Sequence, residues 1–187
     1  GKALAKRVFP DLSEQEAVKK LGDAIFHASR VSSDDPVAEW DTHNRNLREK
    51  TDWLNSRNFS SLIYDGPGTK LEVGLADDHE WMGGASESQN GIICNPNIPS
   101  EEVFTTPHAL KVNGKVCSTK PLSYQGTLIE DIQVEFKDGK IIDANSTKGE
   151  NVLLKVLDSD EGSRRLGEVA LVPHSSPISQ LGITFYN

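Results

Sequence analysis

Two stretches near the start of the chain carry apolar residues at helical spacing. In residues 13–30, Ser13 and Glu16 form the pattern S-x-x-E, a capping box that favours a helix start at this point. Pro36 follows Asp35 and predicts the first turn of a second helix, which continues to about residue 58. The residues that form the two apolar faces are Ala17, Leu21, Ala24, Ile25 and Ala28, then Val37, Trp40, Leu47 and Leu54.

After residue 58 the pattern changes to strands and turns. Leu71, Val73 and Leu75 alternate with Glu72 and Gly74, which predicts a half-buried strand. A hairpin is predicted from one strand at 128–136, a turn at 137–140 and a return strand at 141–144. Further elements are expected at 112–121 and 167–172, both strands, and at 150–157, a helix.

These elements predict an α+β fold, with two N-terminal helices packed on a mainly antiparallel sheet. Residues 1–58 form the expected helical segment, and residues 59–187 form the expected sheet-rich segment. The chain of 187 residues, 36% of them apolar, is long enough to bury a core.

Charge and cysteine content narrow the class of protein further. The formal net charge of −8 disfavours binding to a phosphate backbone, so no nucleic-acid partner is expected. No apolar run approaches the roughly 18 residues that a membrane-spanning helix needs, so no membrane association is expected. Cys94 and Cys117 lack the spacing of a zinc site and are typical of thiols in a reducing compartment, which favours a cytoplasmic location.

Two adjacent acids lie in a proline-rich segment. Glu101 and Glu102 stand between Pro99 and Pro107, and prolines on both sides reduce the entropy lost when a side chain is held at a site. Metal-binding and catalytic groups need such preorganisation. The ordinary alternative is that these acids begin a turn or a helix, where negative charge is favoured.

A third acid, Glu168, adjoins the apolar run at 169–172. A carboxylate that is partly buried beside such a strand needs a partner, because desolvating an isolated charge is very unfavourable. The alternatives are a salt bridge to Arg164 or Arg165, or simple exposure at the start of the strand. The residues alone leave these interpretations open.

Other candidate groups have weaker patterns. Residues 65–69 (DGPGT) could cradle a phosphate, but they lack the full P-loop pattern and more simply connect two strands. His108 and His174 stand close in sequence to the acidic segments and could orient a carboxylate, whereas His43 is expected to be a core or surface residue of its helix. Neither G-x-S-x-G nor H-E-x-x-H occurs, and neither cysteine has a catalytic signature around it, so nucleophilic catalysis has no support.

Residues 97–107 (NIPSEEVFTTP) closely resemble a signature of the thermophilic-type two-metal aminopeptidases, the family of aminopeptidase T and aminopeptidase PepS. The resemblance extends from about Trp40 to the end of the chain. Further blocks match in order: 65–71 (DGPGTKL), 81–84 (WMGG), 119–124 (TKPLSY), 128–131 (LIED), 160–172 (DEGSRRLGEVALV) and 175–178 (SSPI).

The resemblance implies a metal-dependent aminopeptidase that removes N-terminal residues from a peptide substrate. It implies two divalent metal ions, for which Zn²⁺, Co²⁺, Mn²⁺ and Mg²⁺ are candidates. The first metal-binding glutamate of the family falls on Glu102, and the glutamate that bridges both metals falls on Glu168. Glu101, beside Glu102, is the candidate general base, and the family also implies a homodimer.

In the family, further ligands follow the block that ends here at residues 183–187 (ITFYN), and a substantial region precedes the position of Gly1. The chain is therefore expected to be a partial catalytic domain that by itself binds metal weakly and has little activity. One alternative is a non-catalytic assembly domain whose acids form structural salt bridges. Another is a phosphate-ligand binder that uses residues 65–69.

Overall fold

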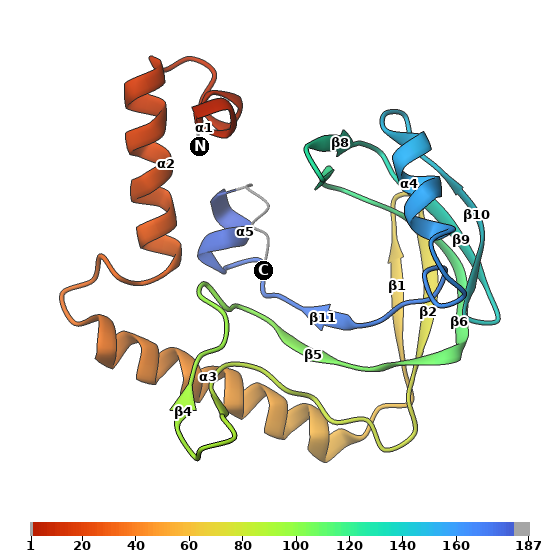
Figure 1. The fold of residues 1–187 in the computed structure, drawn as a ribbon. Coiled ribbons are helices and arrows are strands. Elements are labelled where there is room, and N and C mark those ends of the chain that lie inside the picture. The colour runs from red at the N-terminus through yellow and green to blue at the C-terminus, as the bar shows by residue number, and fades with distance from the viewer. Residues whose placement is uncertain (1, 182–187) are drawn as a thin grey trace. The chain divides into compact units, whose positions relative to one another are not determined.

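The structure, a computed structural model, describes residues 2–181 and divides the chain into two compact units. Unit 1 comprises Gly1–Asp52, Met82–Val103 and Leu171–Asn187, and unit 2 comprises Trp53–Trp81 and Phe104–Ala170. Helices dominate unit 1 and antiparallel strands dominate unit 2, as Figure 1 shows. Residues 183–187 (ITFYN) lie outside the described residues.

Unit 1 begins with α1 (Lys2–Val8) and α2 (Glu14–Ala28). The predicted capping box is confirmed, because Glu16 N donates to Ser13 Oγ and Ser13 N donates to Glu16 Oε2. The two helices share a core formed by Ala5, Ala17 and Leu21, with Val8, Phe9 and Leu12 packed against it. α1 is absent from the sequence-based prediction, because seven residues are too few for a periodic pattern to show.

Replacing Ser13 by alanine should loosen the first turn of α2. Loss of an N-cap side chain typically costs about 1 kcal/mol, so hydrogen exchange of amides in this turn should accelerate about fivefold. The Ser13 side-chain and backbone hydrogen bonds lower the pKa of Glu16. The capping box therefore stabilises the helix at neutral pH, and the difference between wild type and variant should shrink as pH falls through that lowered pKa.

Ser56→Ala provides the control for this measurement, because the Ser56 hydroxyl donates only to Trp53 O of its own helix in the described residues. It should leave exchange in α2 unchanged. Equal exchange rates in wild type and Ser13→Ala at pH 7 would show that the box contributes nothing.

The second predicted helix is confirmed as α3 (Pro36–Arg57), which begins in unit 1. Asp35 Oδ1 accepts a hydrogen bond from Ala38 N at 3.0 Å and so satisfies one amide of the first turn. Leu47 is buried as the apolar stripe predicts, but Val37 is 72% exposed and does not belong to the buried face. Unit 1 also contains the short hairpin of β3 (Ser86–Glu87) and β4 (Ile93–Cys94), and α5 (Pro177–Leu181).

Unit 2 is built on an antiparallel sheet of five strands in the order β1-β2-β6-β9-β10. Val73 and Val112 are register partners on neighbouring strands and are both 1% exposed, so they mark the buried face. α4 (Glu150–Leu157) contacts β10 and β8, and Figure 1 shows it beside the sheet. The strand bounds are β1 Ser61–Gly66, β2 Thr69–Leu75, β6 Pro107–Cys117, β9 Gln133–Lys137 and β10 Lys140–Asn145.

The prediction of one continuous strand at 128–136 is wrong. The structure divides this stretch into β8 (Thr127–Ile129), which pairs with β7 (Leu122–Tyr124), and β9. The break falls at Asp131, whose φ of 52° lies in the left-handed region and interrupts an extended strand. The turn at 137–140 and the helix at 150–157 are confirmed. The strand predicted at 112–121 lies earlier, at Pro107–Cys117.

Two short strands follow the acidic segments. β5 (Val103–Thr105) and β11 (Val169–Leu171) form a two-stranded sheet, and β11 lies within the strand predicted at 167–172. The mainly antiparallel sheet and the N-terminal helices of the predicted α+β fold are therefore both present.

Candidate functional site

The two adjacent acids differ in burial. Glu101 is 6% exposed, whereas Glu102 is half-buried and directly precedes β5. The main chain at Glu102 is closely approached by the glycine-containing segment at 82–84, because a Cβ atom on Gly83 would lie 2.7 Å from Glu102 O. Glycine at position 83 therefore permits two backbone segments of unit 1 to touch beside the candidate metal ligand.

Arg30 is the principal partner of Glu101. Its NH1 donates a short hydrogen bond to Glu101 Oε1, so the two side chains form an ion pair. The side chains of Arg30 and Glu101 are 10% and 5% exposed, which makes this a buried pair. Removing one partner of such a pair leaves an uncompensated charge in a region of low dielectric constant. Glu101 is thus held in place by a strong, directional contact.

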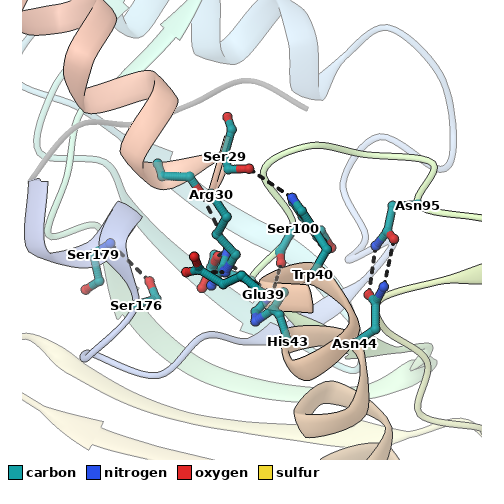
Figure 2. Close-up of polar contacts among 12 residues, drawn as sticks. Ser29, Arg30, Glu39, Trp40, His43, Asn44, Asn95, Ser100, Ser176 and Ser179 are labelled. Carbon is teal, nitrogen blue, oxygen red and sulfur yellow. Dashed lines mark hydrogen bonds and ion pairs between the residues drawn. The ribbon is translucent and has the colours of Figure 1, made fainter. Parts of the chain in front are cut away.

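Further groups hold the Arg30 side chain, and Figure 2 shows Glu39 and Trp40 among them. Arg30 NH1 also donates to Ala28 O at 3.3 Å, and Arg30 Nε lies 4.0 Å from Glu39 Oε1. The guanidinium carbon lies 5.4 Å from the ring centroid of Trp40, within the range of a cation–π contact. Trp40 is itself fixed, because its Nε1 donates to Ser29 O at 2.9 Å.

His43 contacts the same segment from α3. Its Nε2 lies 2.6 Å from Ser100 O and 3.7 Å from Glu101 Oε1. A carbonyl oxygen only accepts, so Nε2 carries the proton in this hydrogen bond. Burial lowers the pKa of His43, and this effect outweighs the hydrogen bond to Ser100, which acts in the opposite direction. The imidazole is therefore neutral at pH 7 and fixes the main chain just before Glu101.

Next to His43 on α3, a pair of amides links the helix to the β4 end of the hairpin. Asn44 Nδ2 donates to Asn95 Oδ1, and Asn95 Nδ2 donates to Asn44 Oδ1, both at 2.9 Å (Figure 2). This reciprocal pair restrains the start of the loop that leads to Ser100 and Glu101.

Glu168 occupies a different environment, at the start of β11 in unit 2. Its side chain is exposed, although the next residue, Val169, is buried. Arg164 pairs with Asp158 at 2.7 Å, and Arg165 donates to the carbonyl oxygen of Ala109. The partial burial expected for Glu168 is wrong, because its side chain is exposed, and its role as a metal ligand stays a prediction. An exposed carboxylate in this position is accessible to a cation.

The histidine that lies beside Glu101 is His43, and not His108 or His174, which stand closer to the acidic segments in the sequence. His108 Nδ1 accepts from Leu110 N, and His174 Nδ1 contacts Ser179 Oγ at 3.1 Å. His43 instead reaches Ser100 and Glu101 across more than fifty positions of sequence. In the sequence, the only feature that could indicate a role for His43 is its place on the same predicted helix as Trp40. Nothing in the sequence around Arg30 indicates that it contacts an acid.

The donor chemistry of the two family-implied ligands suits divalent cations, since both supply carboxylate oxygens. Among residues 2–181, no three or more His, Cys, Asp or Glu side chains are grouped so that they could hold a metal ion. Glu102 and Glu168 therefore belong to no such group among these residues, and each is a candidate metal ligand by itself.

Within the same described residues, no helix has the length and apolar character needed to cross a membrane.

The chain belongs to the family of thermophilic metalloproteases (M29), whose model matches residues 1–187. Its curated relatives are named as aminopeptidases. It is 51% identical to aminopeptidase T of Thermus thermophilus over 183 residues, which are 98% of this chain and 45% of that protein. It is 48% identical to aminopeptidase PepS of Streptococcus thermophilus over 188 aligned residues, covering 100% of this chain and 46% of that protein.

A solved structure shows the same fold. Wild-type AmpT from Thermus thermophilus matches with a TM-score of 0.88 at 50% sequence identity, covering 98% of this chain and 45% of that one. These matches confirm the family and the fold class predicted from sequence. The chain spans just under half the length of the relatives that it matches.

Proposed function

We propose that the protein is a metal-dependent aminopeptidase that removes N-terminal residues from peptides. The observation that supports this most strongly is the match of all 187 residues to a metalloprotease family whose similar members are named as aminopeptidases. The matched range includes residues 97–107, which hold Glu101 and Glu102. The buried contacts of Ser100 and Glu101 also support the proposal, because they hold this segment in place and catalytic groups need such preorganisation.

Within this proposal, Glu102 and Glu168 supply carboxylate ligands, and Glu101 is the general base. Divalent ions held by these residues would polarise the scissile carbonyl and would lower the pKa of bound water. A carboxylate oxygen of Glu101 would accept the proton of the attacking water. In the structure, Arg30 NH1 donates to Oε1 of this carboxylate, and His43 Nε2 lies 3.7 Å from the same oxygen.

The finer features of the proposal follow the family resemblance. They are two divalent ions per active site, drawn from Zn²⁺, Co²⁺, Mn²⁺ and Mg²⁺, a homodimeric assembly and a cytoplasmic location. Elemental analysis of the purified protein tests the metal, and light scattering tests the assembly. Fewer than two bound ions per active site, or a monomer at working concentration, would contradict the corresponding feature.

Metal removal tests the proposed function directly. The protein is purified at the length in which its natural host makes it, called native length below, and assayed with leucine and arginine anilides. Turnover should disappear after dialysis against a chelator and return on addition of Co²⁺ or Zn²⁺, because the bound ions supply the electrostatic stabilisation of the reaction. An N-acetylated leucine anilide should stay uncleaved, because an aminopeptidase requires the free amino group.

Turnover that survives exhaustive chelation would contradict metal dependence, and cleavage of the acetylated substrate would contradict removal of N-terminal residues. The same assay on the 187-residue chain tests the sequence-based expectation that this part alone has little activity.

A further inference from the structure

The Glu101 carboxylate is surrounded by groups that take no direct part in the proposed reaction. Arg30 comes from the residues just after α2, His43 comes from the first half of α3, and both converge on Glu101 Oε1. All three side chains are at most 12% exposed. An arrangement of one cation, one carboxylate and one imidazole at this depth is unfavourable unless each polar group is satisfied, because desolvation of charges opposes it.

The contacts act on two separate parts of the acidic segment. Arg30 holds the carboxylate of Glu101 through NH1, while His43 holds the main chain at Ser100 through its Nε2–H. Together they restrain the position of the backbone and the orientation of the side chain. Glu102 is the next residue, so the same restraint extends to the proposed metal ligand.

The Arg30 side chain is itself preorganised. It stacks on Trp40, lies 4.0 Å from Glu39 and donates to Ala28 O. The Arg30 backbone is in the left-handed region, with φ of 59°, which is uncommon for a residue other than glycine. Ser33 Oγ donates to Arg30 O at 3.0 Å and stabilises this turn. Because these contacts fix the Arg30 guanidinium, it can in turn fix the orientation of the Glu101 carboxylate.

We propose that Arg30 and His43 are positioning residues that act on turnover through Glu101, by fixing its carboxylate and the backbone that precedes it. This inference deepens the proposed function and rests on it. A displacement of about 1 Å at a reacting group can lower a rate by about 10²-fold, so loss of either restraint should appear mainly in kcat.

Arg30→Lys is the principal test, because lysine retains the charge but cannot reproduce the planar fork of the guanidinium. In the native-length protein, kcat should fall about 10²-fold while KM changes less than about threefold. Arg57→Lys is the matched control: Arg57 stacks on Trp53 at 5.4 Å, the same distance as Arg30 on Trp40, and belongs to no proposed site. Its kcat should be unchanged.

A double-mutant cycle separates positioning from general stabilisation. If Arg30 acts through Glu101, adding Arg30→Lys to Glu101→Gln should lower kcat by less than about twofold beyond the loss in Glu101→Gln alone. A merely structural role predicts instead that the two losses multiply, or that kcat is unchanged while only the thermal midpoint falls. Either of these results overturns the inference.

A second pair of variants keeps the test decisive if Arg30→Lys does not fold. His43→Gln retains a side-chain N–H for Ser100 O, whereas His43→Leu removes it. The glutamine variant should retain more than about half of the wild-type kcat, and the leucine variant should lose about tenfold or more. Equal kcat values in the two variants overturn the role of His43.

Failure of this inference is distinguishable from failure of the proposed function. If Glu168→Gln abolishes turnover and Arg30→Lys does not affect it, the aminopeptidase proposal stands and the positioning role is wrong. If the native-length protein hydrolyses no anilide with any of the four metals, both are wrong.

Discussion

Glu168→Gln should lower kcat of the native-length protein by about 10³-fold or more. Removing a single neutral hydrogen-bond donor from an active site costs roughly 10²–10³-fold, and loss of a charged metal ligand is expected to cost at least as much. Glutamine has the shape of glutamate but is neutral and binds cations weakly. Metal content should fall in parallel, which elemental analysis of the purified variant measures.

The exposure of Glu168 makes this substitution informative. A surface change away from packed groups usually alters stability by less than about 0.5 kcal/mol, so the variant and the wild type should unfold at the same temperature when both are stripped of metal by a chelator. Glu161→Gln is the matched control, because Glu161 is an exposed glutamate of the same segment. It should retain full activity. Wild-type turnover in Glu168→Gln, or equal losses in both variants, would show that Glu168 is no metal ligand.

Gly114→Ala should cause a large loss of stability. Gly114 has φ of 119°, a conformation that residues with a side chain rarely adopt, and it lies in β6 between two partner strands. A Cβ atom there would lie 2.1 Å from Lys70 O and 3.1 Å from Leu71 Cα. Backbone cannot move away as a flexible side chain can, so the free energy of unfolding should fall by about 3 kcal/mol.

Denaturant unfolding of the native-length protein, followed by circular dichroism in the far ultraviolet, measures this loss. Gly66→Ala is the control, because Gly66 ends β1, has no strained φ, and leaves open space within 4 Å of the position that an added Cβ would occupy. It should change the midpoint little. A Gly114→Ala protein with the wild-type midpoint would mean that β2 and β6 can separate locally without loss of stability.

Local patterns in the sequence predict local structure well. The capping box at Ser13 and the turn at 137–140 depend on residues three or four positions apart, and both are present. The break at Asp131 escapes prediction because a left-handed aspartate has no distinctive neighbours in the sequence. The apolar residues on either side therefore give the pattern of one strand.

The surroundings of Glu101 show where sequence reasoning ends. Arg30 lies 71 positions from Glu101, and nothing near either residue indicates that they meet. The proline-rich segment does indicate a restrained pair of acids, but not which groups restrain it. Family resemblance supplies the roles of Glu102 and Glu168, and these roles stay predictions until the substitutions are measured. The division into segments 1–58 and 59–187 also stays a prediction.

The discontinuous composition of the two units has a genetic consequence. Unit 1 consists of three separate stretches of chain and unit 2 of two. Any contiguous gene fragment that encodes Gly1–Asp52 and Met82–Val103 must also encode Trp53–Trp81. Deletion mapping therefore cannot separate the two units. A single contiguous exchange between related genes carries unit 1 intact only together with all of unit 2, and it carries unit 2 intact only together with Met82–Val103.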